Sequence, residues 1–210
     1  MQRPLKILSV VVVLLVALIL IGRSLRPAMP ALDRSRFISL GHRLAEETSR
    51  TIQGKGQVVA VLEGAAFGDV HSPLHDQWKS FQQELARQSG ISLAPPEVLP
   101  PDPNDIIPGA GSSRHQLKET LAKHAAADAI VFFFALPDWS LVAPQLPAHV
   151  TAKILVADNQ AGAAKRRYEN YFGNGFLSVL ILAWSEKATG DGFAQNYTVF
   201  TSENYRSLPE

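Results

Sequence analysis

Four short runs of mainly apolar residues mark the body of this chain, at residues 57–63, 128–135, 153–157 and 176–183. A continuous apolar run of this length is typical of a strand that is buried on both of its faces. Other stretches carry apolar residues at helical spacing, which predicts helices at about 34–52, 73–88, 113–126 and 161–171. Strands that alternate with helices in this way predict an α/β fold with a single doubly wound, mostly parallel sheet and right-handed crossovers.

Two further strands are expected beside this main pattern. Residues 91–99 can hold a second strand and residues 197–201 a last one, which gives five or six strands in all. Residues 95–108 contain six prolines. Because proline lacks the N–H that a helix or a sheet ladder requires, this stretch is expected to be irregular.

The N-terminus carries an apolar run of a different kind. Residues 7–22 contain Ser9 as their only polar side chain, and Arg3 and Lys6 precede them. A helix of this length spans about 24 Å, somewhat less than a ~30 Å hydrocarbon core, so it lies between a signal-peptide core and a transmembrane helix. We expect an uncleaved signal-anchor that leaves the body outside the cytoplasm, with cleavage near residue 31 as the alternative. A buried helix is disfavoured because the run has no polar face.

These segments give the expected domain organisation: a signal-anchor or transmembrane segment at 1–26, a linker and helix at 27–56, and an α/β lobe at 57–210. Residues 31–210 hold 16 basic and 19 acidic side chains, a net charge of −3 with histidine neutral. Domains that bind nucleic acid carry a basic patch, so this slightly acidic body predicts no nucleic-acid partner.

Motifs of catalysis and cofactor binding are scarce. The chain has no cysteine, which excludes disulfides, a thiol nucleophile and Cys-ligated metals, and it has no glycine-rich phosphate loop, no G-x-S-x-G and no H-E-x-x-H. His71 and His75 have the spacing of a metal pair on a helix, but Pro73 lies between them and no third ligand is evident. We therefore expect no enzyme activity, no metal and no cofactor, and we interpret residues 165–167 as a solvated basic face.

Candidate binding residues follow the carboxyl ends of the expected strands, where doubly wound folds bind their ligands. They are Phe67 after the first strand, Asp138 and Trp139 after the third, Asp158 and Asn159 after the fourth, and Trp184 after the fifth. Carboxylates and amides form hydrogen bonds with hydroxyl groups, and aromatic rings stack on the apolar face of a sugar. The structural alternatives are a helix cap for Asp158, a cover for the sheet edge for Trp139 and a core position for Trp184.

Six sequence segments in order resemble those of one known family. The chain resembles, over about residues 55–205, the C-terminal lobe of type 1 periplasmic sugar-binding proteins and the related lactose-repressor-type effector domains. The segments are Leu62-Glu63-Gly64, Trp78-Lys79-Ser80-Phe81, residues 127–131, residues 154–159, residues 175–180 and residues 198–204.

The resemblance implies a periplasmic-binding-protein-like lobe for a sugar-like solute. Asp158 matches the family's sugar-contacting Asp, and Gln77 occupies the position of a helix Arg. The family's Asn-Asp turn and final Gln are replaced by residues 136–138 and by Ala183-Trp184. A single lobe leaves a ligand half exposed, so the resemblance implies a second lobe or a transporter subunit as partner.

Two functions of different class remain open. The first is a membrane-anchored, extracytoplasmic (periplasmic) substrate-binding module, accessory to transport or sensing. The second is an interaction or scaffold domain that kept the fold and lost the ligand site. The retained Asp158 favours the first function, and the replaced family residues favour the second.

Overall fold

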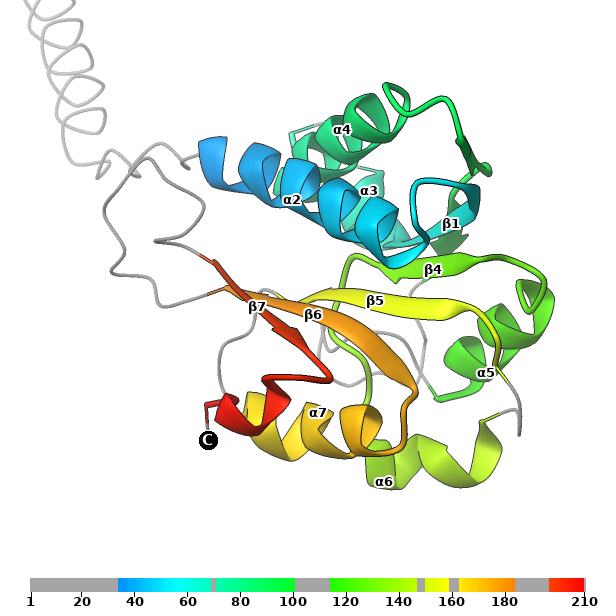
Figure 1. Ribbon diagram of the computed structural model, residues 1–210, viewed down its shortest axis with the longest axis vertical. Coiled ribbons are helices and arrows are strands. Elements are labelled where there is room, and N and C mark those ends of the chain that lie inside the picture. Colours follow the sequence, from blue (N-terminus) through cyan, green and yellow to red (C-terminus); the bar gives the residue numbers. More distant parts are fainter. Residues whose placement is uncertain are drawn as a thin grey trace, which may run out of the picture. The chain divides into compact units, whose positions relative to one another are not determined.

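A seven-stranded sheet forms the centre of the computed structural model, which describes residues 34–68, 71–100, 114–146, 150–158, 163–183 and 197–209 (Figure 1). The strand order is β2-β1-β4-β5-β6-β7, and β3 also pairs with β1. The strands are β1 Gly56–Glu63, β2 Ile91–Leu93, β3 Glu97–Leu99, β4 Ala129–Phe132, β5 Lys153–Asp158, β6 Leu177–Ala183 and β7 Tyr197–Thr201. All pairings are parallel except that of β7 with β6, so the predicted mostly parallel α/β sheet is confirmed.

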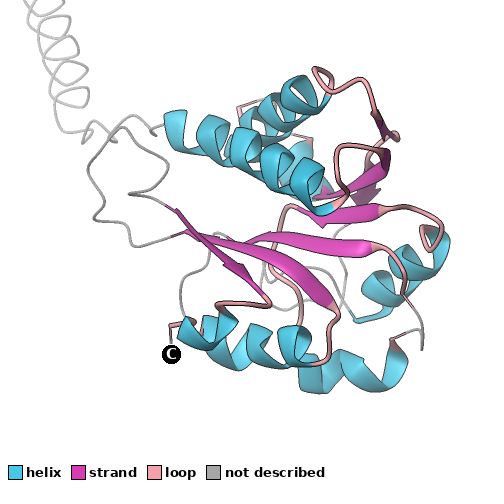
Figure 2. Cartoon of the chain, in the orientation of Figure 1, coloured by secondary structure: helices cyan, strands magenta, loops and turns pink. Residues whose placement is uncertain are grey.

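Helices cover both faces of this sheet, as Figures 1 and 2 show. Helices α2 and α4, with the short α3, lie on one face, and α5, α6 and α7 lie on the other. Their bounds are α2 Ser35–Thr51, α3 Gly64–Phe67, α4 Pro73–Leu85, α5 Arg114–Lys123, α6 Trp139–Val142 and α7 Ala164–Gly173. Two 3-10 turns, Ala143–Gln145 and Tyr205–Ser207, complete the regular structure of the described residues.

The central strands are apolar throughout because each one contributes to two cores. In β1, Val58 and Leu62 face the core under α2 and α4, whereas Val59 and Val61 face the core under α5 and α7. Successive side chains of a strand point to opposite faces, so burial on both faces requires an unbroken apolar run. This is the pattern from which the strands were predicted.

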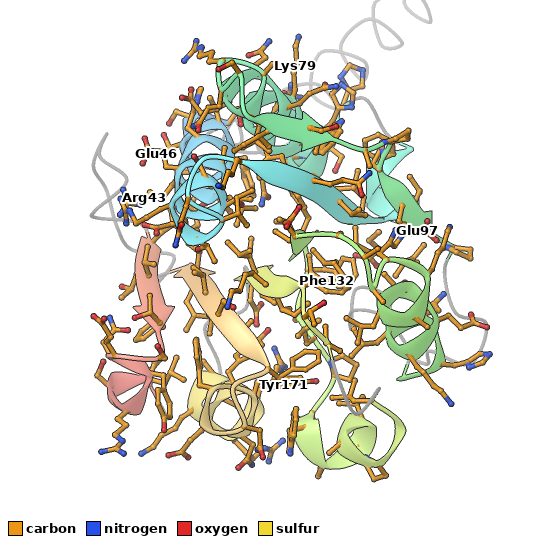
Figure 3. The ribbon with its side chains drawn as sticks, turned by 45° about the vertical axis from the view of Figure 1, so that its right-hand side comes forward. Arg43, Glu46, Lys79, Glu97, Phe132 and Tyr171 are labelled. Atoms are coloured by element: carbon orange, nitrogen blue, oxygen red, sulfur yellow. The ribbon has the colours of Figure 1, made fainter. Side chains whose placement is uncertain are left out.

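Helices α2 and α4 pack unusually closely at Gly41. A Cβ atom at this position would lie 2.0 Å from the Ser80 hydroxyl and 2.2 Å from the Gln77 carbonyl oxygen, so the contact needs a glycine. A hydrogen bond between His42 Nδ1 and Glu84 Oε2, at 3.1 Å, links the same two helices. The outward faces are polar: Figure 3 shows Arg43, Glu46 and Lys79 on the surface, while Phe132 and Tyr171 lie in the interior.

The structure corrects the sequence prediction around the second and third strands. The expected strand at 91–99 is two strands, β2 and β3, because Pro95 and Pro96 cannot donate to the ladder with β1. The expectation that 95–108 is irregular throughout is therefore wrong at β3. Strand β4 ends at Phe132 rather than 135, since the β4–β5 pairing stops at Phe132 and Val156.

Residues 34–210 form one compact unit, and α2 packs against α4 within it. None of the helices among the described residues is long and apolar enough to cross a bilayer, and the apolar run at 7–22 lies outside those residues. The anchor and the domain boundaries at residues 26 and 56 stay predictions.

Candidate functional site

The order of the strands reverses between β1 and β4. After β1 the chain enters α3 and α4 on one face, and from β4 it proceeds to α6 on the other face (Figure 1). The two connections leave neighbouring strands in opposite directions, and doubly wound sheets bind their ligands at the carboxyl edge of such a pair of strands. Five of the seven predicted site residues lie in the described part of the chain: Phe67, Gln77, Asp138, Trp139 and Asp158.

Asp158 is the last residue of β5, as predicted, and its side chain is buried, with 1% exposed. The carboxylate oxygen Oδ2 accepts a hydrogen bond from the Tyr168 hydroxyl at 2.8 Å and from Arg167 Nη1 at 3.0 Å. A buried carboxylate is costly unless it is paired and hydrogen-bonded, and α7 supplies both kinds of contact.

This arrangement raises the pKa values of Tyr168 and Arg167. Burial, followed by the charge of Asp158, raises the pKa of Tyr168 well above its ordinary value, so the hydroxyl remains a donor. Burial alone would lower the pKa of Arg167, but the contacts with Tyr168 and Asp158 outweigh it and the pKa is raised. The network therefore consists of a neutral phenol and a guanidinium around one carboxylate.

Asp138 and Trp139 lie beside α7. The Asp138 carboxylate is 3.7 Å from Arg166 Nη2; the Arg166 side chain is 80% exposed and that of Asp138 37%. The Trp139 ring packs edge-on against Tyr171, with a centroid distance of 4.8 Å, and against Phe176. Because five residues separate Asp138 from the end of β4, Asp138 and Trp139 do not follow that strand directly. The contacts that the structure describes for Trp139 are with this aromatic cluster.

Phe67 and Gln77 belong to α3 and α4, the two helices that follow β1. Phe67 ends α3, and its ring centroid is 6.2 Å from that of His75. Gln77 is fully buried, and neither its Oε1 nor its Nε2 atom has a hydrogen-bond partner among the described residues. An unpaired buried amide costs about 1–3 kcal/mol, so this side chain calls for a polar partner.

Asn159 and Trp184 lie outside the described residues. The ligand role of the seven predicted residues stays a prediction. Sequence reasoning missed Arg167 and Tyr168, since residues 165–167 were interpreted as solvated. A signal was present: Tyr168 shares the buried face of α7 with Ala164, Tyr171 and Phe172, so Arg167 borders that face rather than opposing it.

Two surface hollows lie away from these residues. One, of about 420 Å³, is bounded by α4, β2 and the residues after β2, among them Trp78, Leu93 and Pro95. The other, of about 540 Å³, is near the amino ends of β1 and β5 and includes Lys55, Asp128 and Lys153. None of the predicted site residues lines either hollow.

Comparison with known proteins gives structural but not sequence matches. No protein-family model matches the chain, and no curated protein matches it in sequence. Among solved structures, the arabinose-binding protein AraP from Geobacillus stearothermophilus matches with a TM-score of 0.56 at 12% identity, over 83% of this chain and 63% of that one. The chain has the fold of periplasmic sugar-binding proteins.

Two other structures support this fold. The sugar-binding protein of a sugar ABC transporter from Bacillus halodurans matches with a TM-score of 0.57 at 12% identity, over 82% of this chain and 64% of that one. The fructose-binding periplasmic domain of a hybrid two-component system matches with a TM-score of 0.54 at 14% identity, over 81% and 58%. The chain thus spans less than two thirds of the length of each structure, and its single sheet is consistent with one lobe of the fold.

Proposed function

We propose that this chain is a membrane-anchored, extracytoplasmic module that binds a small, polar, sugar-like solute as an accessory to transport or sensing. The observation that carries this proposal is the divergence of β1 and β4 at the carboxyl edge of a sheet whose fold is that of sugar-binding proteins. Ligands of open α/β sheets bind at such an edge.

The buried, unpaired amide of Gln77 in α4 supports a polar ligand. Its two polar atoms have no partner in the part of the chain that the structure describes, and a hydroxyl group can donate to Oε1 and accept from Nε2. A sugar presents several such hydroxyl groups. Because one lobe cannot enclose a ligand, the proposal includes a second lobe or a transporter subunit that covers the other side.

The anchor and the location rest on the sequence. Residues 7–22 are apolar except for Ser9, with basic residues before and after them. A membrane-anchored protein should stay in the membrane fraction after alkaline carbonate washing, and its N-terminal peptide should begin at residue 1. A mature chain that begins near residue 31 would show a cleaved signal instead.

A second function is favoured by the state of Asp158. Its buried carboxylate is bonded to Arg167 and Tyr168 within the lobe, as expected of an interaction or scaffold domain that has lost its ligand site. In that case Arg167 and Tyr168 donate to the carboxylate oxygen that a sugar hydroxyl would otherwise contact.

Calorimetry on the full chain in detergent micelles separates the two functions. Arabinose and fructose are the first sugars to titrate, since solved neighbours are named for binding them. We expect binding that Gln77→Ala weakens about tenfold, because the amide loses a hydrogen bond to the ligand. Gln83→Ala, on the exposed surface of the same helix, is the matched control and should leave the Kd unchanged. Absence of binding to a panel of neutral sugars by the folded protein favours the scaffold.

A further inference from the structure

The hydroxyl group of Tyr168 lies where β4 parts from β5. The register of these two strands ends with the pair Phe132 and Val156, two residues before Asp158. On the other side of the gap, the chain continues from β4 through a buried segment that includes Leu136. Backbone hydrogen bonds of the β4–β5 ladder therefore do not set the position of Leu136 relative to Asp158.

Tyr168 bridges this gap with a single atom. Its hydroxyl donates to Asp158 Oδ2 at 2.8 Å and accepts from the backbone N–H of Leu136 at 3.3 Å. The Tyr168 side chain is fully buried, so it cannot exchange these partners for water without local unfolding. Both bonds come from one rigid ring, and they fix the strand end and the neighbouring connection relative to each other.

The adjacent turn of α7 offers a natural comparison. The Tyr171 hydroxyl donates to the carbonyl oxygen of Pro137 at 2.7 Å, so two tyrosines hold consecutive residues of the same segment against α7. Of these two hydroxyl groups, that of Tyr168 is the one bonded to Asp158. Arg167 approaches the same carboxylate oxygen with its side chain 20% exposed, at the solvent side of the network.

We propose that Tyr168 is a positioning residue: it fixes the Asp158 carboxylate and the segment at 136–138 in the relative placement that a ligand at the carboxyl edge requires. This inference rests on the proposed sugar-binding function. Binding sites need their polar groups held to within roughly 0.5 Å, and here one buried hydroxyl supplies that constraint for the end of β5 and for the connection after β4.

Two variants of the full chain in detergent micelles test the proposal without any ligand. Tyr168→Phe removes the acceptor of the Leu136 amide, and Tyr171→Phe removes an equivalent hydroxyl that accepts from no described amide. Hydrogen exchange resolved at Leu136 should become about tenfold faster in Tyr168→Phe, as expected for one lost hydrogen bond, and should stay within about threefold of the parent in Tyr171→Phe. Equal effects of the two substitutions would contradict the proposal.

Measurement of the Kd for a sugar separates a positioning role of Tyr168 from a purely structural one. With arabinose or fructose as the probe, Tyr168→Phe should raise the Kd about tenfold and Tyr171→Phe less than threefold. Faster exchange at Leu136 with an unchanged Kd would show that the bridge is structural and overturn the positioning role. If neither sugar binds the parent, the proposed function fails while the exchange result stands on its own.

If Tyr168→Phe does not fold, hydrogen exchange in the parent protein still tests the bridge. The Leu136 amide lies outside the β4–β5 ladder, yet the proposal requires it to exchange as slowly as the amide of Phe133, which donates to the Val61 carbonyl oxygen at 3.1 Å. Exchange of Leu136 on the timescale of an unprotected amide would overturn the bridge.

Discussion

Two buried polar side chains, Gln77 and Asp158, differ in how the molecule accommodates them. Gln77 lies in the helical layer of α2 and α4 and has no partner among the described residues, whereas Asp158 is bonded to Tyr168 and Arg167 of α7. The difference follows from what each layer places nearby. The α2–α4 layer presents the close contact at Gly41, and α7 presents a phenol and a guanidinium in successive positions.

This contrast assigns different roles to the two sides of the carboxyl edge. On the α7 side the polar groups satisfy one another, so substitutions there should mainly cost stability and order. On the α4 side the buried amide of Gln77 remains to be satisfied, so its removal should mainly affect the binding of a polar group that approaches it.

The largest effect is expected for Asp158→Ala. It removes the common acceptor of Tyr168 and Arg167, and breaking a buried, charged network of this kind costs about 3–5 kcal/mol. Urea denaturation monitored by circular dichroism measures the loss. Asp138→Ala is the matched control, because its partner Arg166 is 80% exposed and its own side chain 37% exposed, so loss of the pair should change stability by less than about 1 kcal/mol. Similar losses in both variants would remove the distinction between the two acids.

Gly41→Ala should have the next largest effect. The new Cβ atom would overlap the Ser80 hydroxyl and the Gln77 carbonyl oxygen, and such overpacking costs about 1–3 kcal/mol. Thermal unfolding measures it. Gly173→Ala at the end of α7 is the control, since nothing lies within 4 Å of its Cβ position. If Gly41→Ala were as stable as the parent, the close contact of α2 and α4 would not constrain the fold.

Gln77→Met should stabilise the protein by about 1 kcal/mol, because it replaces two unpaired polar atoms with apolar ones of similar volume. Gln83→Met, on the exposed surface of α4, should change stability by less than about 0.5 kcal/mol. A destabilised Gln77→Met would mean that the amide has a partner outside the described residues, and the two sides of the edge would then be alike.

The smallest effect concerns alkaline pH. Burial raises the pKa of Tyr168 and of Tyr171 above the ordinary value near 10, so each phenol contributes stability below pH 10 that is lost as pH rises through the folded-state pKa. Absorbance at 295 nm should show both tyrosines ionising together with unfolding rather than before it. Ionisation of Tyr168 in the native protein near pH 10 would contradict its burial.

The succession of strands and helices along the chain could be predicted from the sequence because it depends on local pattern. Val58 to Leu62 are apolar without interruption because alternate side chains enter two different cores, and amphipathic spacing marks α2, α4 and α7. Asp158 was placed at the end of its strand for the same reason: the apolar run stops there.

Only the tertiary structure decided the contacts that give these elements their roles. The bonds from Tyr168 and Arg167 to Asp158 depend on how α7 packs against β5, and the bridge to Leu136 depends on where β4 leaves the ladder. The requirement for glycine at position 41 depends on the approach of α2 to α4. Each is a contact between segments whose separation is set by register and packing, and local sequence pattern carries no information about either.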